Sequence, residues 1–364
     1  MKTKRIAVVT TSIGDEKVFE RFFKEYGKCK IPRGCKIDFI VIGDKNSPHI
    51  DFDKVKYFKS FNKKFGFKFI SWVEQDMHIM KEFPYMEDLI PWRRIQRRNI
   101  GYIEAYRKGY DFTITVDDDN FPMDDNFFIE HYTNISIHHK IYYDHKDVVW
   151  MNPCFKMDNI IHRGYPLEYR DVKSSAKVRG GSRARVALSE GFWVGDADVD
   201  AVSRLVGEGT INKKPSSNVV LSPNIIAPSN TQNTIFRTEY TPAMFLSAKV
   251  GRYDDIWASY LLKAILYVTG ELVSYGKPIV KQDRNDHDIF KDFEKEVYGM
   301  KHTKEFVEEL FAYVKENKKN LEICELRYMI FQIANDMALN SSKFSWYYID
   351  IIKWVEVLRN GKEW

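Results

Sequence analysis

The sequence predicts an α/β fold, and three stretches in its first third support that class. Residues 5–11 and 37–44 have the composition of apolar β-strands, and residues 16–26 between them have that of a helix. A helix that joins two strands at this spacing indicates a right-handed parallel crossover. Residues 111–116 alternate β-branched and aromatic side chains and predict another buried strand. Ligands of open α/β sheets bind at the carboxyl ends of such strands, so we expect a site just after residue 116.

The composition is that of a folded chain with mixed surface charge. Hydrophobic residues make up 44% of the 364 residues, enough for a large core in one elaborated domain or a domain with an appendage. The formal net charge of +5 does not by itself indicate nucleic acid, and a small anionic substrate fits it equally well. The four cysteines are scattered without a CxxC pair, so neither a zinc site nor a disulfide framework is predicted.

The chain ends and the apolar windows predict a cytoplasmic protein without a membrane span. Residues 1–10 lead directly into a strand, and they lack the apolar region of a signal peptide. The longest apolar window, residues 256–273, contains Lys263 and Glu271 and predicts a buried helix rather than a membrane helix. Cysteines without a disulfide pattern also favour a reducing compartment.

The other elements are expected in a simple order along the chain. They are a short strand at 55–58, a helix at 91–108, the strand at 111–116, a helix at 129–139, a strand at 148–151, a mobile basic loop at 173–185, a long apolar helix at 256–270 and amphipathic helices after 294. This order predicts an α/β domain over residues 1–300 and a helical appendage over residues 301–364. The basic loop is either a lid over the site or a surface linker.

Four arginines lie in the helix expected at residues 91–108. Arg93 and Arg97, and likewise Arg94 and Arg98, are four residues apart and would stack on one broad face of that helix. Like charges in this arrangement repel, which suggests an anionic partner. The alternative is a solvated face, which we favour for two or three of the four. At least one arginine is expected to face a diphosphate.

The acidic triplet Asp117-Asp118-Asp119 follows the strand at 111–116. Carboxylates this close raise one another's pKa unless they share a positive charge. Mg²⁺ or Mn²⁺ supplies such a charge and completes its coordination with substrate phosphate oxygens. The alternative is a solvated acidic turn. Asp44 ends an earlier strand where a carboxylate commonly meets a nucleoside, although aspartates that form turns are more frequent.

Two further segments carry candidate catalytic residues. Arg163 and Arg170 flank a turn that Gly164 and Pro166 make rigid. Asp254 and Asp255 precede the long apolar helix, where the alternative role of an aspartate is to cap the helix N-terminus.

The order and spacing of four motifs resemble the reversibly glycosylated polypeptides, also known as UDP-arabinopyranose mutases. The motifs are the acidic triplet, Arg163-Gly164-Tyr165-Pro166 with Arg170, Trp193 before Asp198-Val199-Asp200, and Gly251-Arg252-Tyr253-Asp254-Asp255-Ile256-Trp257. The resemblance covers roughly residues 1–300. It implies a GT-A glycosyltransferase fold, which is a Rossmann-like nucleotide-sugar fold with a mixed central sheet, an Asp-x-Asp motif and a divalent metal.

The resemblance also implies roles for particular residues. Asp117, Asp118 and Asp119 would hold the metal and UDP, with Asp44, Arg98 and Trp193 as further binding residues. Arg163 and Arg170 match two essential arginines, and Arg163 matches the site of reversible sugar attachment. Asp254 and Asp255 match an acidic pair near the transferred sugar. The family's histidine aligns near Gln282, so the displaced His287 is the candidate for a third metal ligand.

Chemistry at these residues leaves three functions open. The first is a UDP-sugar pyranose/furanose mutase, favoured because both arginines of the Arg163 segment are kept. The second is a transferase that moves the sugar to an acceptor glycan, protein or modified nucleic acid, and the third is a non-catalytic UDP-sugar-binding protein. Arg163 either captures the sugar covalently or pairs with the diphosphate, and guanidinium is a poor nucleophile because it stays protonated. The expected partners are a UDP-sugar, an unidentified acceptor and further copies of the chain.

Overall fold

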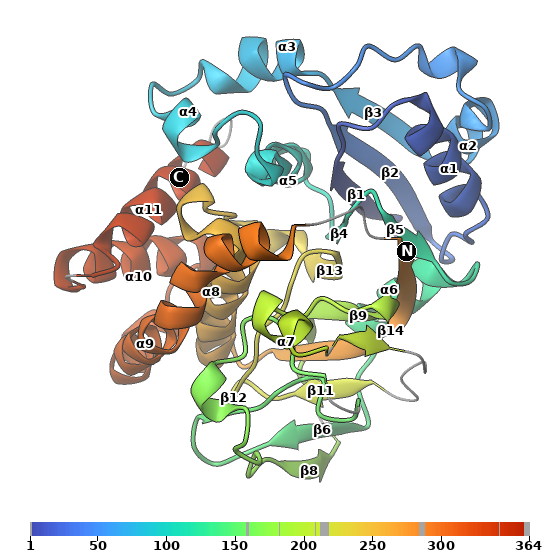
Figure 1. The fold of residues 1–364 in the computed structure, drawn as a ribbon. Helices are drawn as coiled ribbons and strands as arrows, with labels where there is room; N and C mark the ends of the chain where they lie inside the picture. The colour runs from blue at the N-terminus through green and yellow to red at the C-terminus, as the bar shows by residue number, and fades with distance from the viewer. Residues whose placement is uncertain are drawn as a thin grey trace.

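A mixed β-sheet runs through the molecule (Figure 1). The computed structural model describes residues 2–157, 160–181, 183–207, 209–211, 218–283, 288–341 and 343–359. The strands of the described residues are β1 Lys4–Thr11, β2 Cys35–Ile42, β3 Gly66–Ile70, β4 Phe112–Val116, β5 Asn120–Pro122, β6 Ile141–Asp144, β7 Val149–Trp150, β8 Lys177–Gly180, β9 Val186–Asp196, β10 Thr210–Ile211, β11 Val219–Leu221, β12 Ile225–Ile226, β13 Asn233–Arg237 and β14 Leu272–Gln282.

The strand order explains why the sheet is mixed. Ten strands follow the order β3-β2-β1-β4-β13-β9-β14-β11-β6-β8, while β10 pairs with β9 and β5 with β14. The strands β3, β2, β1 and β4 are parallel, and β13 then runs antiparallel to both β4 and β9. The short strands β7 and β12 form a separate parallel pair. The predicted α/β class and the predicted parallel crossover are both confirmed.

Helices cover both faces of the parallel strands. The α-helices of the described residues are α1 Glu16–Gly27, α2 Phe58–Lys64, α3 Trp72–Gln75, α4 Met86–Leu89, α5 Arg98–Arg107, α6 Phe127–Ser136, α7 Ala201–Leu205, α8 Asp254–Thr269, α9 Ile289–Leu321, α10 Leu326–Asn340 and α11 Ser345–Arg359. Phe22 of α1 packs edge-on against Phe39 of β2, with ring centroids 5.6 Å apart. Gly101 of α5 lies against Ile42. Ile42 is three residues beyond Phe39 in β2, so its side chain points to the opposite face of the sheet.

Local sequence explains where α1 begins. The side chain of Asp15 accepts hydrogen bonds from the backbone N–H groups of Lys17 and Val18, which have no partners inside the helix. The buried residues Phe19, Phe22, Phe23 and Tyr26 then recur at helical spacing and bury one face of α1.

The C-terminal helices pack on the rest of the fold through aromatic side chains. Trp257 of α8 stacks on Phe306 of α9, with ring centroids 4.0 Å apart and planes 4° apart. Figure 1 shows α8, α9, α10 and α11 together on one side of the sheet. Helix α9 is continuous from Ile289 to Leu321 and passes through residue 300, where the sequence places the start of the appendage. None of the described helices combines the length and apolarity needed to cross a membrane.

Three predictions for irregular segments are wrong. The segment expected as a basic loop at residues 173–185 contains strand β8, which pairs antiparallel with β6. Residues 55–58 form no strand, because Tyr57 has a φ of 70° and leads into helix α2. The helix expected at residues 91–108 begins only at Arg98, after a 3₁₀ turn at Ile95–Arg97. Arg93, with a φ of 58°, therefore lies outside the helix, and the four arginines do not share one face.

Candidate functional site

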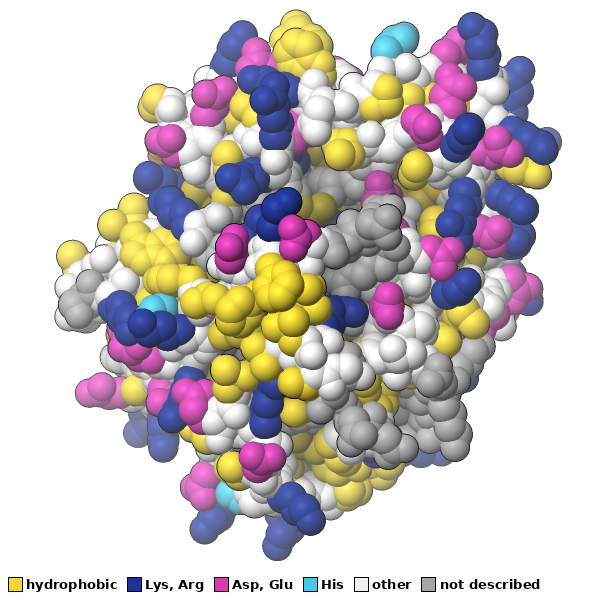
Figure 2. Space-filling model, viewed as in Figure 1, with side chains coloured by type: hydrophobic (Ala, Val, Ile, Leu, Met, Phe, Trp, Pro, Cys, Tyr) yellow, Lys and Arg dark blue, Asp and Glu magenta, His cyan; other side chains and the backbone are white. Residues whose placement is uncertain are grey.

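Two neighbouring cavities lie at the carboxyl edge of the parallel strands. The first has a volume of about 350 Å³ and the second about 260 Å³. Arg93, Arg94 and Ile95 line both, so the segment before α5 forms the wall between them. Figure 2 shows a hollow in the middle of this face with basic and acidic side chains beside it. The other charged residues of the first cavity are Arg98, Asp117, Arg163, Arg252, Asp254, Asp255 and Lys295.

Sheet topology brings the ends of β1, β2 and β4 together at this edge. The three strands are parallel, so Ser12, Asp44 and Asp117 all follow carboxyl ends that face the same way. The backbone N–H of Asp117 donates to the carbonyl of Gln232 at 3.1 Å, which continues the pairing of β4 with the chain before β13. Thr11, Ser12, Asp44 and Asp118 line the second cavity.

Arg98 is held by the carboxylate of Asp117. Its Nη2 donates to Asp117 Oδ1, and its Nη1 donates to the carbonyl of Thr231 at 2.9 Å. Burial lowers the pKa of Arg98, but the charge and hydrogen bond of Asp117, together with the charges of Tyr102 and Asp255, raise that pKa above its ordinary value. A guanidinium that is 2% exposed and lines the cavity is therefore a fixed positive charge. The structure thus places Arg98 beside the first residue of the acidic triplet.

The second member of the triplet faces the other cavity. Asp118 Oδ2 accepts a hydrogen bond from the hydroxyl of Ser12 at 2.7 Å. Burial raises the pKa of Asp118, and the charge of Asp117 adds to the rise. A positive ligand beside Asp118 would relieve both effects.

The metal prediction depends on a donor set that the triplet supplies only in part. Within the described ranges, no three or more His, Cys, Asp or Glu side chains form a group placed to hold a metal ion. His287, the predicted third ligand, lies outside the described residues. Mg²⁺ commonly binds one or two carboxylates and takes its other ligands from water and substrate phosphates. Asp117 in the first cavity and Asp118 in the second each offer a carboxylate of the kind that this smaller donor set uses.

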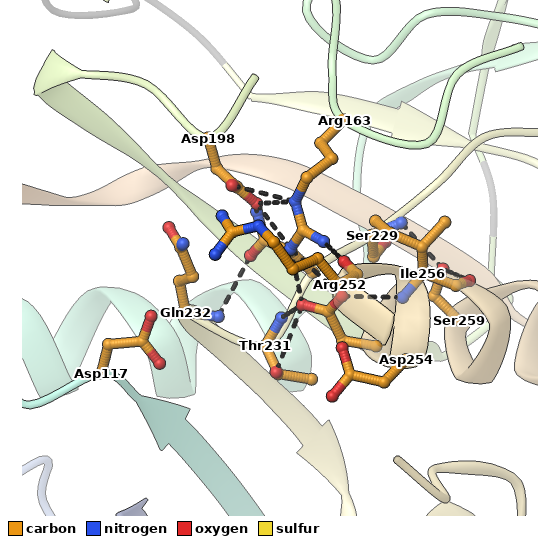
Figure 3. Close-up of polar contacts among 12 residues, drawn as sticks. Asp117, Arg163, Asp198, Ser229, Thr231, Gln232, Arg252, Asp254, Ile256 and Ser259 are labelled. Carbon is orange, nitrogen blue, oxygen red and sulfur yellow. Dashed lines mark hydrogen bonds and ion pairs between the residues drawn. The ribbon is translucent and has the colours of Figure 1, made fainter. Parts of the chain in front are cut away.

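Asp254 and Asp255 occupy the first turn of α8 and line the first cavity. Asp254 Oδ2 accepts a hydrogen bond from Gln96 Nε2 at 2.7 Å. Burial and the neighbouring charge of Asp255 raise the pKa of Asp254 to about 7. A carboxyl group with that pKa can give up or take up a proton at neutral pH. Figure 3 shows Asp254 and Asp117 pointing toward the same space from opposite sides.

Arg163, which lines the first cavity, holds Asp255 in place through a paired hydrogen bond (Figure 3). Its Nη2 donates to Asp255 Oδ1 and Oδ2 at 3.1 and 3.0 Å, and its Nε donates to Asp198 Oδ1 and Oδ2 at 3.0 and 2.9 Å. Its Nη1 donates to the carbonyl of Arg252. Burial lowers the pKa of Arg163, but the charges of Asp198 and Asp255 raise it well above its ordinary value. Arg163 is therefore a buried cation that binds protein groups through each of its nitrogens.

Glycines shape the backbone on both sides of this ion pair. Gly251 has a φ of +69°, and a Cβ built there would lie 2.3 Å from the carbonyl oxygen of Lys295. Gly164 has a φ of +88°, and its Cβ would lie 2.3 Å from Cγ2 of Ile256. Both positions therefore require glycine, both for its positive φ and for the close approach.

A buried ion pair below Arg163 was not predicted from the sequence. His162 Nε2 lies 2.7 Å from Glu190 Oε1, and both side chains are fully buried. Burial lowers the pKa of His162, but the charge and hydrogen bond of Glu190 raise it above the ordinary value. Glu190 Oε2 accepts the backbone N–H of Asn230 at 3.0 Å, and Asn230 Nδ2 donates to Asp198 at 3.0 Å. The pair thus supports the residues that hold Arg163. The one signal of this pair in the sequence was Glu190, a charged residue in the middle of an apolar strand.

The remaining predicted residues lie at different distances from the cavities. Asp44 is buried in the wall of the second cavity, and its Oδ2 accepts the backbone N–H of Arg94 at 3.2 Å. Arg170 pairs with Asp200, the N-cap of α7, and lines neither cavity. Trp193 is fully buried in β9, with its ring 5.9 Å from that of His162, and it also lines neither cavity.

Solved structures match the chain over most of its length at low identity. TarS 1-349 of S. aureus in complex with UDP aligns with a TM-score of 0.40 and 12% identity, covering 100% of this chain and 93% of that one. The mannosyltransferase PcManGT of Pyrobaculum calidifontis, in complex with GDP-Man and Mn²⁺, aligns with a TM-score of 0.40 and 7% identity, covering 98% and 86%.

Curated relatives are named as mutases of a sugar nucleotide. UDP-arabinopyranose mutase 1 of Arabidopsis thaliana is 29% identical over 145 residues, which are 38% of this chain and 37% of that protein. Probable UDP-arabinopyranose mutase 4 of the same plant is 24% identical over 216 residues, which are 56% and 54%. The chain thus spans about a third to a half of the length of these relatives.

A family match covers most of the chain. The family described as "Reversibly glycosylated polypeptide" matches residues 62–362. This range includes the acidic triplet, the Arg163 segment and the start of α8. The chain therefore belongs to the reversibly glycosylated polypeptide family.

Proposed function

We propose that this chain is an enzyme that interconverts the pyranose and furanose forms of a UDP-sugar. One observation carries the proposal: an Arg98–Asp117 pair and an Asp254–Asp255 pair line the same cavity, and that cavity adjoins a second one at Asp44. Membership of the family and the names of the curated relatives support the substrate class. The parallel strands with an acidic triplet at their carboxyl edge support a GT-A type of nucleotide-sugar fold.

The two cavities suggest how a UDP-sugar would lie. The nucleoside would occupy the second cavity, where Asp44 and Ser12 offer hydrogen-bonding groups. The diphosphate would cross the shared wall beside Arg93 and Arg94, within reach of Arg98, because arginine forks match phosphate oxygens. The sugar would then enter the first cavity and meet Asp254.

A divalent cation bound by the acidic triplet would neutralise charge on the departing diphosphate. Arg98 would do the same from the protein side as a fixed cation. Mg²⁺ and Mn²⁺ both prefer such oxygen ligands, so the chemistry of the donors does not distinguish them.

Asp254 would carry the proton that ring contraction requires. The bond from C1 to the diphosphate oxygen breaks, and its electron pair leaves with UDP. The C4 hydroxyl then bonds to C1 and passes its proton to the carboxylate of Asp254. The diphosphate bonds to C1 again, the bond from C1 to the old ring oxygen breaks, and that oxygen takes the proton from Asp254. A pKa of about 7 suits a group that must both accept and return a proton.

This route makes no covalent bond to Arg163. Its guanidinium is charged, and its donors bind Asp198, Asp255 and the carbonyl of Arg252. Sugar attachment at Arg163 would require its deprotonation inside a ring of negative groups, so we propose that Arg163 positions Asp255 instead. The fixed carboxylate of Asp255 would stabilise positive charge at C1.

Isomer-resolving chromatography tests the proposal. UDP-arabinopyranose is incubated with purified protein and Mn²⁺, without an acceptor. A new UDP-sugar peak of unchanged mass is expected for a mutase. Release of UDP without that peak would indicate a transferase that needs an acceptor. An unchanged substrate that still binds in calorimetry would indicate a non-catalytic UDP-sugar-binding protein.

A further inference from the structure

The chain that leads into α5 contacts four other segments through Arg94, Gln96, Arg97 and Arg98. These contacts are the Arg94 N–H with Asp44 after β2, Gln96 with Asp254 at the start of α8, Arg97 with Gln75 of α3, and Arg98 with Asp117 after β4. A displacement of this segment would therefore move the wall between the two cavities together with the support of Asp254. The segment is held firmly, because Gln96, Arg97 and Arg98 are at most 5% exposed.

We infer that Gln96 is a positioning residue for Asp254. Gln96 holds the carboxyl group of Asp254 in both of its protonation states, and it connects that group to the nucleotide side of the site. The inference rests on the proposed function, because it concerns the proton that Asp254 carries. Gln96 Nε2 donates to Oδ2 of Asp254 at 2.7 Å. Both residues line the first cavity, where the proposed function places the sugar.

The chemistry of the side-chain amide explains why glutamine suits this position. An ionised carboxylate only accepts hydrogen bonds, and the NH₂ group of Gln96 donates to it. A protonated carboxyl group can donate, and the carbonyl oxygen of the same amide can accept that proton after a rotation. Asp254 can therefore change protonation during a turnover without losing its neighbour. Neither glutamate nor methionine offers both functions.

Other charged and titratable groups also lie near Asp254, and they influence its pKa together with Gln96. Asp255 raises the pKa of Asp254, whereas Arg163 and the hydrogen bond from Gln96 lower it. The phenols of Tyr102 and Tyr347 are near enough for Asp254 to raise their pKa, although burial is the larger cause. The same cavity also contains the charged groups of Arg93, Arg94, Arg98, Asp117, Arg252 and Lys295.

Two substitutions of Gln96 test the inference. Gln96→Met removes the amide while keeping a similar volume, so we expect kcat for UDP-arabinopyranose to fall about tenfold or more. The Kd for UDP, measured by calorimetry, should stay within about threefold of wild type, because the proposed pose places only the sugar against Asp254. Gln96→Glu places a second carboxyl group against Asp254, and the limb of the pH–kcat profile that reports Asp254 should move up by about one pH unit. Gln332→Glu, on α10 and outside both cavities, is the matched control for added charge.

The outcomes separate this inference from the proposed function. A wild-type chain that turns over no UDP-sugar would overturn the proposed function, and this inference with it. Wild-type turnover combined with an unmoved pH limb in Gln96→Glu would overturn this inference alone. Equal losses of kcat and of UDP affinity in Gln96→Met would also overturn it, since they would show that Gln96 only packs the segment.

Discussion

Replacing Arg163 by methionine should lower the free energy of unfolding, because it destabilises the region around Asp198 and Asp255. The substitution removes a cation that is 5% exposed and leaves two carboxylates, 0% and 5% exposed, without their counter-ion. Loss of one partner from a buried ion pair typically costs about 3–5 kcal/mol. Both carboxylates keep other donors, Asn230 Nδ2 for Asp198 and the Thr231 N–H for Asp255, so we expect the lower half of that range.

Urea denaturation followed by circular dichroism measures this loss of unfolding free energy. Arg21→Met is the control, because Arg21 and Asp283 form an ion pair with side chains 48% and 30% exposed. Exposed pairs of this kind contribute about 0–1 kcal/mol. Arg163→Lys keeps the charge but not the planar fork, so it should lose less stability than Arg163→Met.

A specific result would refute this account of Arg163. If Arg163→Met lowers the free energy of unfolding by less than about 1 kcal/mol, the folded state does not need the guanidinium to compensate the two buried carboxylates. Mass spectrometry of the wild-type chain after incubation with UDP-arabinopyranose gives an independent check. A sugar found on Arg163 would show that the side chain leaves its buried ion pairs during turnover.

Three further predictions concern the chemistry of the site. Asp254→Asn removes the proton carrier and should lower kcat by about 10²–10⁴-fold while calorimetry finds UDP affinity nearly unchanged; a kcat near that of wild type would rule out Asp254 as the carrier. Asp119→Ala should abolish the activity that Mn²⁺ restores after chelation, and it should leave the circular dichroism spectrum unchanged. Full activity of the wild-type chain in excess chelator would contradict the role proposed for the metal. His162→Gln should destabilise the chain most below about pH 6.5, the ordinary pKa of histidine. The pKa of His162 is raised in the folded state, so the stabilisation that it contributes is complete below its ordinary pKa and is lost as the pH rises through the raised folded pKa. Urea melts across the pH range check this, and a destabilisation that grows with pH would contradict it.

Sequence patterns predicted the parts of the site that depend on regular elements. The acidic triplet could be placed because β4 is a short apolar strand that must end where three carboxylates begin. Asp254 and Asp255 could be placed at the start of α8 because a long apolar run follows them. Periodicity and the order of strands carry this kind of information, and the sheet topology then brings the two segments together.

The rest depended on contacts between segments that are far apart in the chain. The approach of Gln96 to Asp254 joins residues 158 positions apart, and nothing local marks either as the other's partner. The expected helix at residues 91–108 failed because Arg94 binds Asp44 through its backbone, a tertiary contact that outweighs local propensity. Trp193 was expected to bind the ligand, but it lies in a part of β9 whose side chains are buried in the core, and it is 0% exposed there.

The continuity of α9 makes the C-terminal helices mechanically part of the site. Lys295 lies in the cavity wall, and Glu296 binds Arg252, whose carbonyl accepts from Arg163. From these residues the same rod continues to Leu321, and a 33-residue helix is about 50 Å long. Truncation at residue 300 would end α9 in mid-helix and remove Phe306, on which Trp257 of α8 stacks. The C-terminal helices therefore support the helix that begins with Asp254 and Asp255.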